Sequence, residues 1–260
     1  MSSIGADLRY GAVRAVRKLA GAAIDLVWPP RSLLTEAVLD APGRIEPELW
    51  RELRFLGPPW CARCGFPFDA EAPPDAVCGG CAVDPPHFDA ARAALAYDDH
   101  ARRLVLDLKR HGRRDGLPTF ASWMCAAAGD LVAEADVLAP APLHWTRLAQ
   151  RTFNQAAWLA QALGRASGRP VALDLIVRSR MRRSQAGLTA DQRRRNAAGA
   201  YSVPERKRAQ AAGKRILLVD DVFTTGATLA ACALALRRAG AAEINAVTLA
   251  RVVRPADVAI

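Results

Sequence analysis

Apolar and polar positions divide the chain into two parts near residue 88. From residue 89 onward, continuous apolar runs alternate with longer segments in which apolar residues recur at helical spacing. This alternation is typical of an α/β domain, whose parallel sheet is covered by helices on both faces. The runs predict strands at 92–97, 136–143, 172–177, 215–222 and 244–252. The helical spacing predicts helices at 100–112, 115–135, 147–165 and 227–240.

The first 88 residues follow a different pattern. Residues 8–28 place apolar positions at helical spacing among basic ones, which predicts an amphipathic helix that packs on its own protein. Surface contact with a membrane is the alternative for this helix, which is too short and too charged to span a bilayer. We therefore expect a helix and linker at 1–57, a cysteine-containing region at 58–88 and the α/β domain at 89–260. No secretory signal is visible, so we expect a cytoplasmic protein.

One stretch, ILLVDDVFTTGAT at 216–228, has an order that core packing does not require. Its apolar start suits a central strand buried on both faces, so Asp220 and Asp221 emerge at the carboxyl end, where open α/β sheets bind ligands. After two more residues, five residues form a turn into a helix N-terminus, where backbone N–H groups and hydroxyls favour a phosphate. These are Thr224, Thr225, Gly226, Ala227 and Thr228.

The two aspartates would repel a phosphate but suit the hydroxyl groups of a sugar, which donate hydrogen bonds to carboxylates. The stretch therefore predicts a ligand with a ribose and a phosphate. Nucleoside-triphosphate loops and dinucleotide folds fit less well, because their glycine-rich signatures are missing. The alternative without a ligand is that the threonines only cap the helix and the aspartates lie in a solvated turn.

Four of the six cysteines form two Cys-x2-Cys pairs, CARC and CGGC, separated by a short proline-rich loop. The residues are Cys61, Cys64, Cys78 and Cys81. This spacing predicts one structural Zn²⁺ in a zinc ribbon, and four thiolates leave no open position for chemistry. Disulfides and a redox pair are the alternatives. Cys125 and Cys232 lie in helical patterns as small apolar groups, and His87 is expected at the surface.

The charge of the chain is strongly positive. The 260 residues carry a formal net charge of +10, with a pI near 10.0. Such a charge favours anionic partners such as phosphates or nucleic acid, although a generally basic surface is the alternative interpretation.

Residues 216–228 resemble the motif by which type I phosphoribosyltransferases bind phosphoribosyl pyrophosphate. The wider chain, from about Trp28 to the C-terminus, resembles the ComF family, which joins a cysteine-rich zinc-ribbon region to a phosphoribosyltransferase-like domain and is linked to competence and DNA uptake. Three further blocks of the sequence are similar to that family. They contribute Lys109 and Gly112; Arg147, Arg151, Phe153, Asn154 and Gln155; and Gln185, Leu188, Arg193 and Asn196.

The resemblance implies a site for phosphoribosyl pyrophosphate with Mg²⁺. Asp220 and Asp221 would hold the ribose hydroxyls, and residues 224–228 would bind the 5-phosphate. Lys109 and Arg147 are the candidates for neutralising charge on the leaving pyrophosphate, with surface positions on helices as their alternative. Residues 179–200 would be a mobile hood, from which Arg182, Arg183 and Arg193 close over a phosphate; a disordered basic loop is the alternative.

The chain departs from the family in two places. The upstream region has no further cysteine pairs, so one zinc is expected and apolar packing should hold that region. Thr152 stands where glycine is common before Phe-Asn-Gln, which leaves the backbone of that turn open.

Two functions of different classes remain from the sequence. The first is a Mg²⁺-dependent phosphoribosyltransferase that acts on an unknown base or amine. The second is a non-catalytic protein that handles single-stranded DNA during uptake. An adaptor at the membrane surface is a third. Trp145, Phe153 and Phe223 are the candidate platforms for a base, although buried aromatic residues are more often part of a core.

Overall fold

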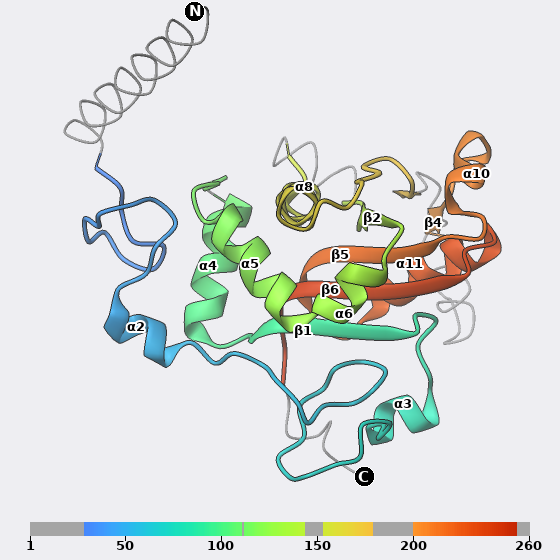
Figure 1. Cartoon of the computed structure of the whole chain (residues 1–260), viewed down its shortest axis with the longest axis horizontal. Helices are drawn as coiled ribbons and strands as arrows, with labels where there is room; N and C mark the ends of the chain where they lie inside the picture. The colour runs from blue at the N-terminus through green and yellow to red at the C-terminus, as the bar shows by residue number, and fades with distance from the viewer. Residues whose placement is uncertain (1–28, 111, 144–152, 179–199, 254–260) are drawn as a thin grey trace, which may run out of the picture.

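The computed structural model describes residues 29–110, 112–143, 153–178 and 200–253. Within them, four strands form one parallel sheet in the order β1-β6-β5-β2 (Figure 1). The strands are β1 (Ala90–Ala96), β2 (Val137–Pro140), β5 (Arg215–Phe223) and β6 (Glu243–Arg251). The α/β class predicted from the sequence is therefore confirmed.

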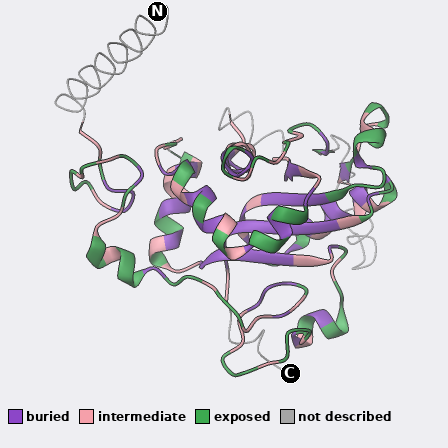
Figure 2. Ribbon diagram, viewed as in Figure 1, coloured by how far each residue is buried: buried purple, intermediate pink, exposed green. Residues whose placement is uncertain are grey.

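Strand β5 lies inside the sheet, between β2 and β6. Leu217 pairs with Leu138 of β2 and with Asn245 of β6. Residues 216–219 are almost fully buried, because helices cover both faces of the strand. The continuous apolar run thus marks a central strand, as predicted. The purple ribbon of the sheet in Figure 2 shows this burial.

Four helices cover one face of the sheet, and α11 (Ala227–Arg238) covers the other (Figure 1). The four are α4 (Asp99–Arg110), α5 (Leu117–Ala127), α6 (Gly129–Glu134) and α8 (Gln155–Ser167). Leu159 and Leu163 of α8 are completely buried between the helix and the sheet. The face with α11 also receives the four cysteines.

Two predicted helices have different bounds in the structure. The helix predicted at 115–135 is two helices, α5 and α6, because the backbone turns at Ala128 just before Gly129, a poor helix former. The helix predicted at 147–165 begins only at Gln155 in the described residues. Asn154 is its N-cap, and its Oδ1 accepts a hydrogen bond from Ala156 N–H at 3.0 Å.

The strand predicted at 172–177 is wrong for most of its length. Val171 makes a single parallel bridge to Leu138, and the chain then turns at 173–174. β3 (Val177–Arg178) pairs antiparallel with β4 (Tyr201–Ser202) outside the main sheet. Leu175 and Ile176 are buried against the face with α11 without joining a ladder. A short apolar run indicates burial, but not which partner provides it.

Short elements complete the described chain. They are α2 (Pro47–Glu52), α3 (Gly79–Val83), the 3-10 turn η1 (Glu205–Lys207) and α10 (Arg208–Ala211). The upstream region is held by apolar packing, as expected, because Leu33, Leu34 and Leu53 are buried against α4 and α5. Within the described part of the chain, no helix has both the length and the apolar character needed to cross a membrane. The amphipathic segment 8–28 lies outside that part.

Candidate functional site

The two aspartates lie near the carboxyl end of β5, as the sequence predicts, but they face opposite sides of the sheet. Asp221 faces α4 and α8, where it contacts Lys109 and Gln155. Asp220 faces α11, where its charge acts on Cys232. This difference is expected because adjacent side chains in a strand alternate between faces. The pair therefore flanks the end of the strand instead of forming one carboxylate cluster.

Asp221 has both carboxylate oxygens engaged. The residue is 5% exposed. Its Oδ1 atom lies 3.0 Å from Lys109 Nζ in an ion pair. Oδ2 accepts a hydrogen bond of 2.6 Å from Gln155 Nε2. A buried carboxylate needs such partners, because leaving it uncompensated in a medium of low polarity is costly. Lys109, on the last turn of α4, is thus placed beside the end of β5.

Asp220 is half-buried and has a different electrostatic environment. Its Oδ1 accepts a hydrogen bond of 2.8 Å from the N–H of Asp221. Burial first, and the nearby Asp221 carboxylate second, raise the pKa of Asp220 to about 8. Burial and the charge of Asp220 also raise the pKa of Cys232 on α11. A carboxyl group of this kind changes protonation within the range of neutral buffers.

The loop at 224–228 leads directly from β5 into α11. Thr224, Thr225 and Thr228 are exposed, and Gly226 is the N-cap of the helix with φ of 74°. A Cβ atom on Gly226 would lie only 2.6 Å from Cζ of Phe223, so both the backbone angle and the space require glycine. Gly226 has no side chain to cap the helix, and the Thr225 hydroxyl accepts only a long hydrogen bond of 3.4 Å from Ala227 N–H. The first N–H groups of the helix therefore provide donors for an anion.

The described residues of the family-like block at 147–155, Phe153, Asn154 and Gln155, lie at the start of α8. Asn154 Nδ2 donates to the carbonyl of Ala141 at 3.1 Å, so this residue joins the end of β2 to α8. Phe153 stacks on Trp158 with ring centroids 4.2 Å apart, and the Arg114 guanidinium lies 4.0 Å from the Trp158 ring. Gly112, with φ of 63°, lies against both rings. Phe223 is buried, so it belongs to the core and offers no platform.

Several predicted residues lie outside the described parts of the chain. They are Trp145, Arg147, Arg151, Thr152, Arg182, Arg183, Gln185, Leu188, Arg193 and Asn196.

The structure brings the four cysteines of the two pairs together. The Sγ atoms of Cys61, Cys64, Cys78 and Cys81 all lie within 4.8 Å of one another, and all four residues are buried. Cys64 and Cys78 have their sulfur atoms 3.7 Å apart, close to the edge of about 3.8 Å of a tetrahedron with Zn–S bonds of about 2.3 Å. The arrangement fits one zinc ion with four thiolate ligands.

Backbone donors support the same cluster. The N–H groups of Cys64 and Cys78 point at Cys61 Sγ, at 3.4 and 3.3 Å. Without a metal, hydrogen bonds from Cys64 and Cys81 lower the pKa of Cys61, and the same hydrogen bonds raise the pKa of Cys64 and Cys81. Gly65 has φ of 69° and approaches the carbonyl of Ala91, whereas the glycines of the second pair begin α3. His87 is exposed, as expected.

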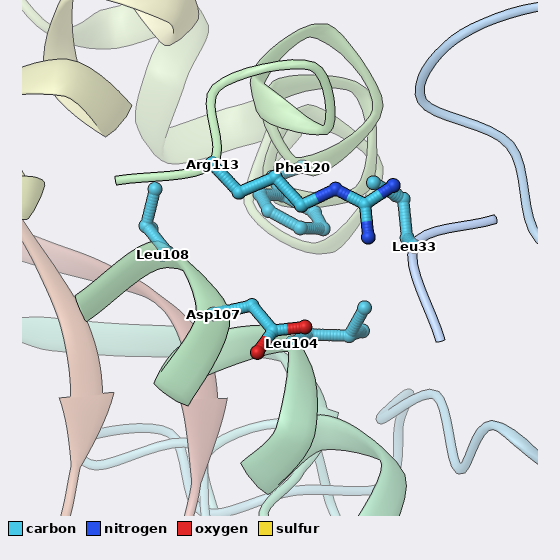
Figure 3. Close-up of a pocket in the computed structure, with 6 residues that line it drawn as sticks. All are labelled: Leu33, Leu104, Asp107, Leu108, Arg113 and Phe120. Carbon is cyan, nitrogen blue, oxygen red and sulfur yellow. The ribbon is translucent and has the colours of Figure 1, made fainter. Parts of the chain in front are cut away.

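A separate small pocket lies between α4, α5 and the upstream region (Figure 3). Leu33, Leu104, Leu108 and Phe120 make most of its wall. Its cation, Arg113, is paired with Asp115 at 3.0 Å. This apolar lining does not suit a sugar phosphate.

Sequence reasoning missed two buried arginines, Arg92 on β1 and Arg251 on β6. Both reach the backbone of the first cysteine pair, where Arg92 donates to the carbonyl of Ala62 and Arg251 to that of Cys64. Their signal was weak: each is a single arginine in an apolar strand, and its partner lies far away in sequence.

Comparisons with known proteins agree with this architecture. The phosphoribosyl transferase domain family matches residues 150–257. Competence protein F of Haemophilus influenzae is 30% identical over 198 residues, which cover 74% of this chain and 85% of that protein. Competence protein ComFC of Bacillus subtilis is 29% identical over 200 residues, which cover 74% of this chain and 77% of that protein.

Among solved structures, the chain is similar to the allosteric regulatory enzyme of purine biosynthesis. The sequence identity is 22% and the TM-score is 0.38, and the match covers 55% of this chain and 30% of that one. The chain thus spans less than a third of the length of that enzyme.

The relatives assign the chain to a family. The parallel sheet and the matching domain family assign its fold. The chain therefore belongs to the ComF family, with an α/β domain of the type I phosphoribosyltransferase fold and four clustered cysteines that can hold a metal ion.

Proposed function

We propose that the protein binds phosphoribosyl pyrophosphate at the end of β5 and transfers the phosphoribosyl group to a nitrogen acceptor. One observation carries the proposal. Two residues separate Asp220 and Asp221 from an exposed hydroxyl-rich loop, which leads into the N-terminus of α11 with a glycine as its N-cap. Carboxylates recognise sugar hydroxyls, and a helix N-terminus recognises phosphate, so the two parts of the ligand have separate partners in the right order.

The 5-phosphate would bind at residues 224–228. The first N–H groups of α11 and the hydroxyls of Thr224, Thr225 and Thr228 would donate to its oxygens. Gly226 would allow close approach, because it has no side chain. Ala227 would contribute its backbone only.

The ribose would lie beside the end of β5. Because Asp221 already accepts from Lys109 and Gln155, Asp220 is the more accessible acceptor for a ribose hydroxyl. It accepts best as a carboxylate, so binding at neutral pH should release a proton. Asp221 would then act by holding Lys109 beside the leaving group.

The transfer itself requires that negative charge on the pyrophosphate be neutralised as its bond to the anomeric carbon breaks. Lys109 and Arg147 would supply positive charge there, and Arg182 and Arg193 would contact phosphate oxygens. Mg²⁺ bound with the substrate would supply further charge neutralisation, held mainly by phosphate oxygens together with the Asp220 carboxylate.

Calorimetry tests this proposal. Native protein titrated with phosphoribosyl pyrophosphate and Mg²⁺ should bind, and the Asp220→Asn/Asp221→Asn variant should bind at least about tenfold more weakly. Asp174→Asn is the matched control, because Asp174 is an exposed carboxylate that pairs with Lys207 away from the end of β5. No binding to the native protein, or equal binding to the double variant, would contradict the proposal. Release of pyrophosphate with trial bases and amines would then test the transfer.

Single-strand DNA handling is the second candidate, and one observation favours it. Phe153 and Trp158 are only partly buried, and their stack lies beside Arg114 in a chain of net charge +10. Such stacks accept bases of any sequence. Affinity for an oligonucleotide should then fall with rising salt and should drop in Phe153→Ala. An affinity independent of salt would reject it.

A further inference from the structure

Arg92 and Arg251 are buried, and a buried positive charge requires groups that compensate it. They are 9% and 4% exposed, and the Nε atom of each has no hydrogen-bond partner among the described atoms. The Nη1 atom of Arg92 donates to the carbonyls of Ala62 and Ala91, and that of Arg251 donates to the carbonyl of Cys64. The Asp130 carboxylate compensates the charge of Arg92 in part, but a buried guanidinium is costly unless a further negative group balances it.

The four-cysteine cluster provides that negative group. Four thiolates around one Zn²⁺ carry a net charge of −2, since each bound cysteine is deprotonated. Two arginines approach the cluster from the sheet, one on β1 and one on β6. They therefore balance the charge of a metal-loaded site.

Of these two arginines, Arg251 also contacts Phe223, the residue that precedes the loop at 224–228. Its guanidinium carbon lies 4.6 Å from the ring of Phe223 and 5.3 Å from that of Phe66. Phe223 pairs with Arg251 in the sheet and packs edge-to-face on Phe88, with centroids 6.1 Å apart. Arg92 instead lies 4.7 Å from the ring of Trp60, within the cysteine region.

The Phe223 ring sets the position of the loop. It is the last residue of β5, and Gly226 approaches it so closely that a Cβ atom would clash at 2.6 Å. A continuous path of contacts thus runs from the Cys64 carbonyl through Arg251 and Phe223 to Gly226. Each contact in the path is between buried residues, where packing leaves little room for independent movement.

We propose that Arg251 is a positioning residue that links the four-cysteine cluster to the loop at 224–228, so that metal binding at the cysteines orders the loop. When the metal leaves and the cysteines take up protons, the cluster loses the net negative charge that holds the guanidinium, and the ring of Phe223 loses one of its supports. Any effect on ligand affinity rests on the proposed phosphate site. The ordering of the loop by the metal does not depend on that site.

Hydrogen exchange of the peptide that covers 223–229 tests the link without any ligand. In zinc-loaded native protein this peptide should be protected, and removal of zinc by a chelator should speed its exchange about five- to tenfold. In zinc-loaded Arg251→Lys the exchange should already be fast, because lysine keeps the charge but not the planar contact with both rings. Zinc removal should then add little.

Arg92→Lys is the matched control, because it changes a buried arginine behind the same cysteine pair that does not contact Phe223. It should weaken zinc retention, measured by the rate of release to a coloured chelator, while the zinc-loaded loop stays protected. Phe223→Leu is a second variant, in which the hydrogen bond from Arg251 to the Cys64 carbonyl should be kept. Its loop should exchange fast with or without zinc, although its zinc retention is normal.

The outcomes separate this proposal from the proposed function. If loop exchange in native protein does not respond to zinc, or if Arg251→Lys and Arg92→Lys behave alike, the link is overturned even when phosphoribosyl pyrophosphate binds. If exchange follows the expected pattern but the ligand does not bind, the link stands and the proposed function fails.

Discussion

At the scale of single residues, Asp220 has the environment least like that of a surface carboxylate. Its pKa is raised to about 8, mainly by burial and further by Asp221. In the unfolded chain the same group would titrate near 3.9. Between these two values the native state holds a proton that the unfolded chain has released. The stability contributed by this group is therefore full below about pH 4 and falls as the pH rises toward 8.

Asp220→Asn should remove this loss, because an amide has no proton to release. We expect the ligand-free variant to exceed native protein in unfolding free energy by about 1–3 kcal/mol at pH 8 and by less at pH 5. Denaturant titrations at the two pH values measure the difference.

Asp136→Asn is the control with the opposite sign. The backbone N–H of Arg215 donates to Asp136 and lowers its pKa, so its contribution is present above about pH 4 and is lost below. This variant should gain nothing at pH 8. A gain for Asp220→Asn that is the same at pH 5 and pH 8 would contradict the assigned pKa.

At the scale of elements, the junction of β5 and α11 depends on Gly226. Gly226→Ala would introduce a residue that disfavours the left-handed backbone and a Cβ atom that meets the Phe223 ring. We expect a loss of about 1–3 kcal/mol in unfolding free energy and at least tenfold weaker binding of phosphoribosyl pyrophosphate. Thermal or denaturant unfolding and calorimetry measure the two effects.

Gly129→Ala is the matched control for that substitution. Gly129 begins α6, has no positive φ, and has nothing within 4 Å of an added Cβ atom. Alanine there should be neutral or stabilising by about 0.5 kcal/mol, with unchanged ligand binding. Equal behaviour of the two variants would mean that the loop tolerates a side chain.

At the scale of the whole molecule, the cysteine cluster and the α/β domain share one core. The four cysteines pack in the same apolar cluster as Phe66, Phe88 and residues of β5 and β6. Metal binding should therefore stabilise the domain as well as its own region.

Metal analysis should find about one zinc per chain in native protein and much less in Cys61→Ser. The loss should lower unfolding free energy by about 2 kcal/mol or more, measured by denaturant titration with and without chelator. Cys125→Ser is the control, because Cys125 lies on α5 outside the cluster. Full stability after complete zinc removal would show that the cluster contributes nothing to the domain.

The sequence by itself determined the features that depend on local patterns. The run at 216–219 indicated a central strand, because burial on both faces requires apolar residues at every position. The Cys-x2-Cys spacing indicated a four-thiolate cluster, because metal geometry restricts the spacing of ligands. The position of Asp220 and Asp221 before a helix N-terminus followed from the order of the elements.

Only the tertiary structure decided which distant residues meet. It paired Asp221 with Lys109 and Gln155, placed Asp220 on the other face of the sheet, and began α8 after an Asn154 cap. It also buried Leu175 and Ile176 without a strand, and brought Arg251 between Cys64 and Phe223. These contacts join residues far apart in the chain, and their energies depend on burial and charge that no local pattern contains.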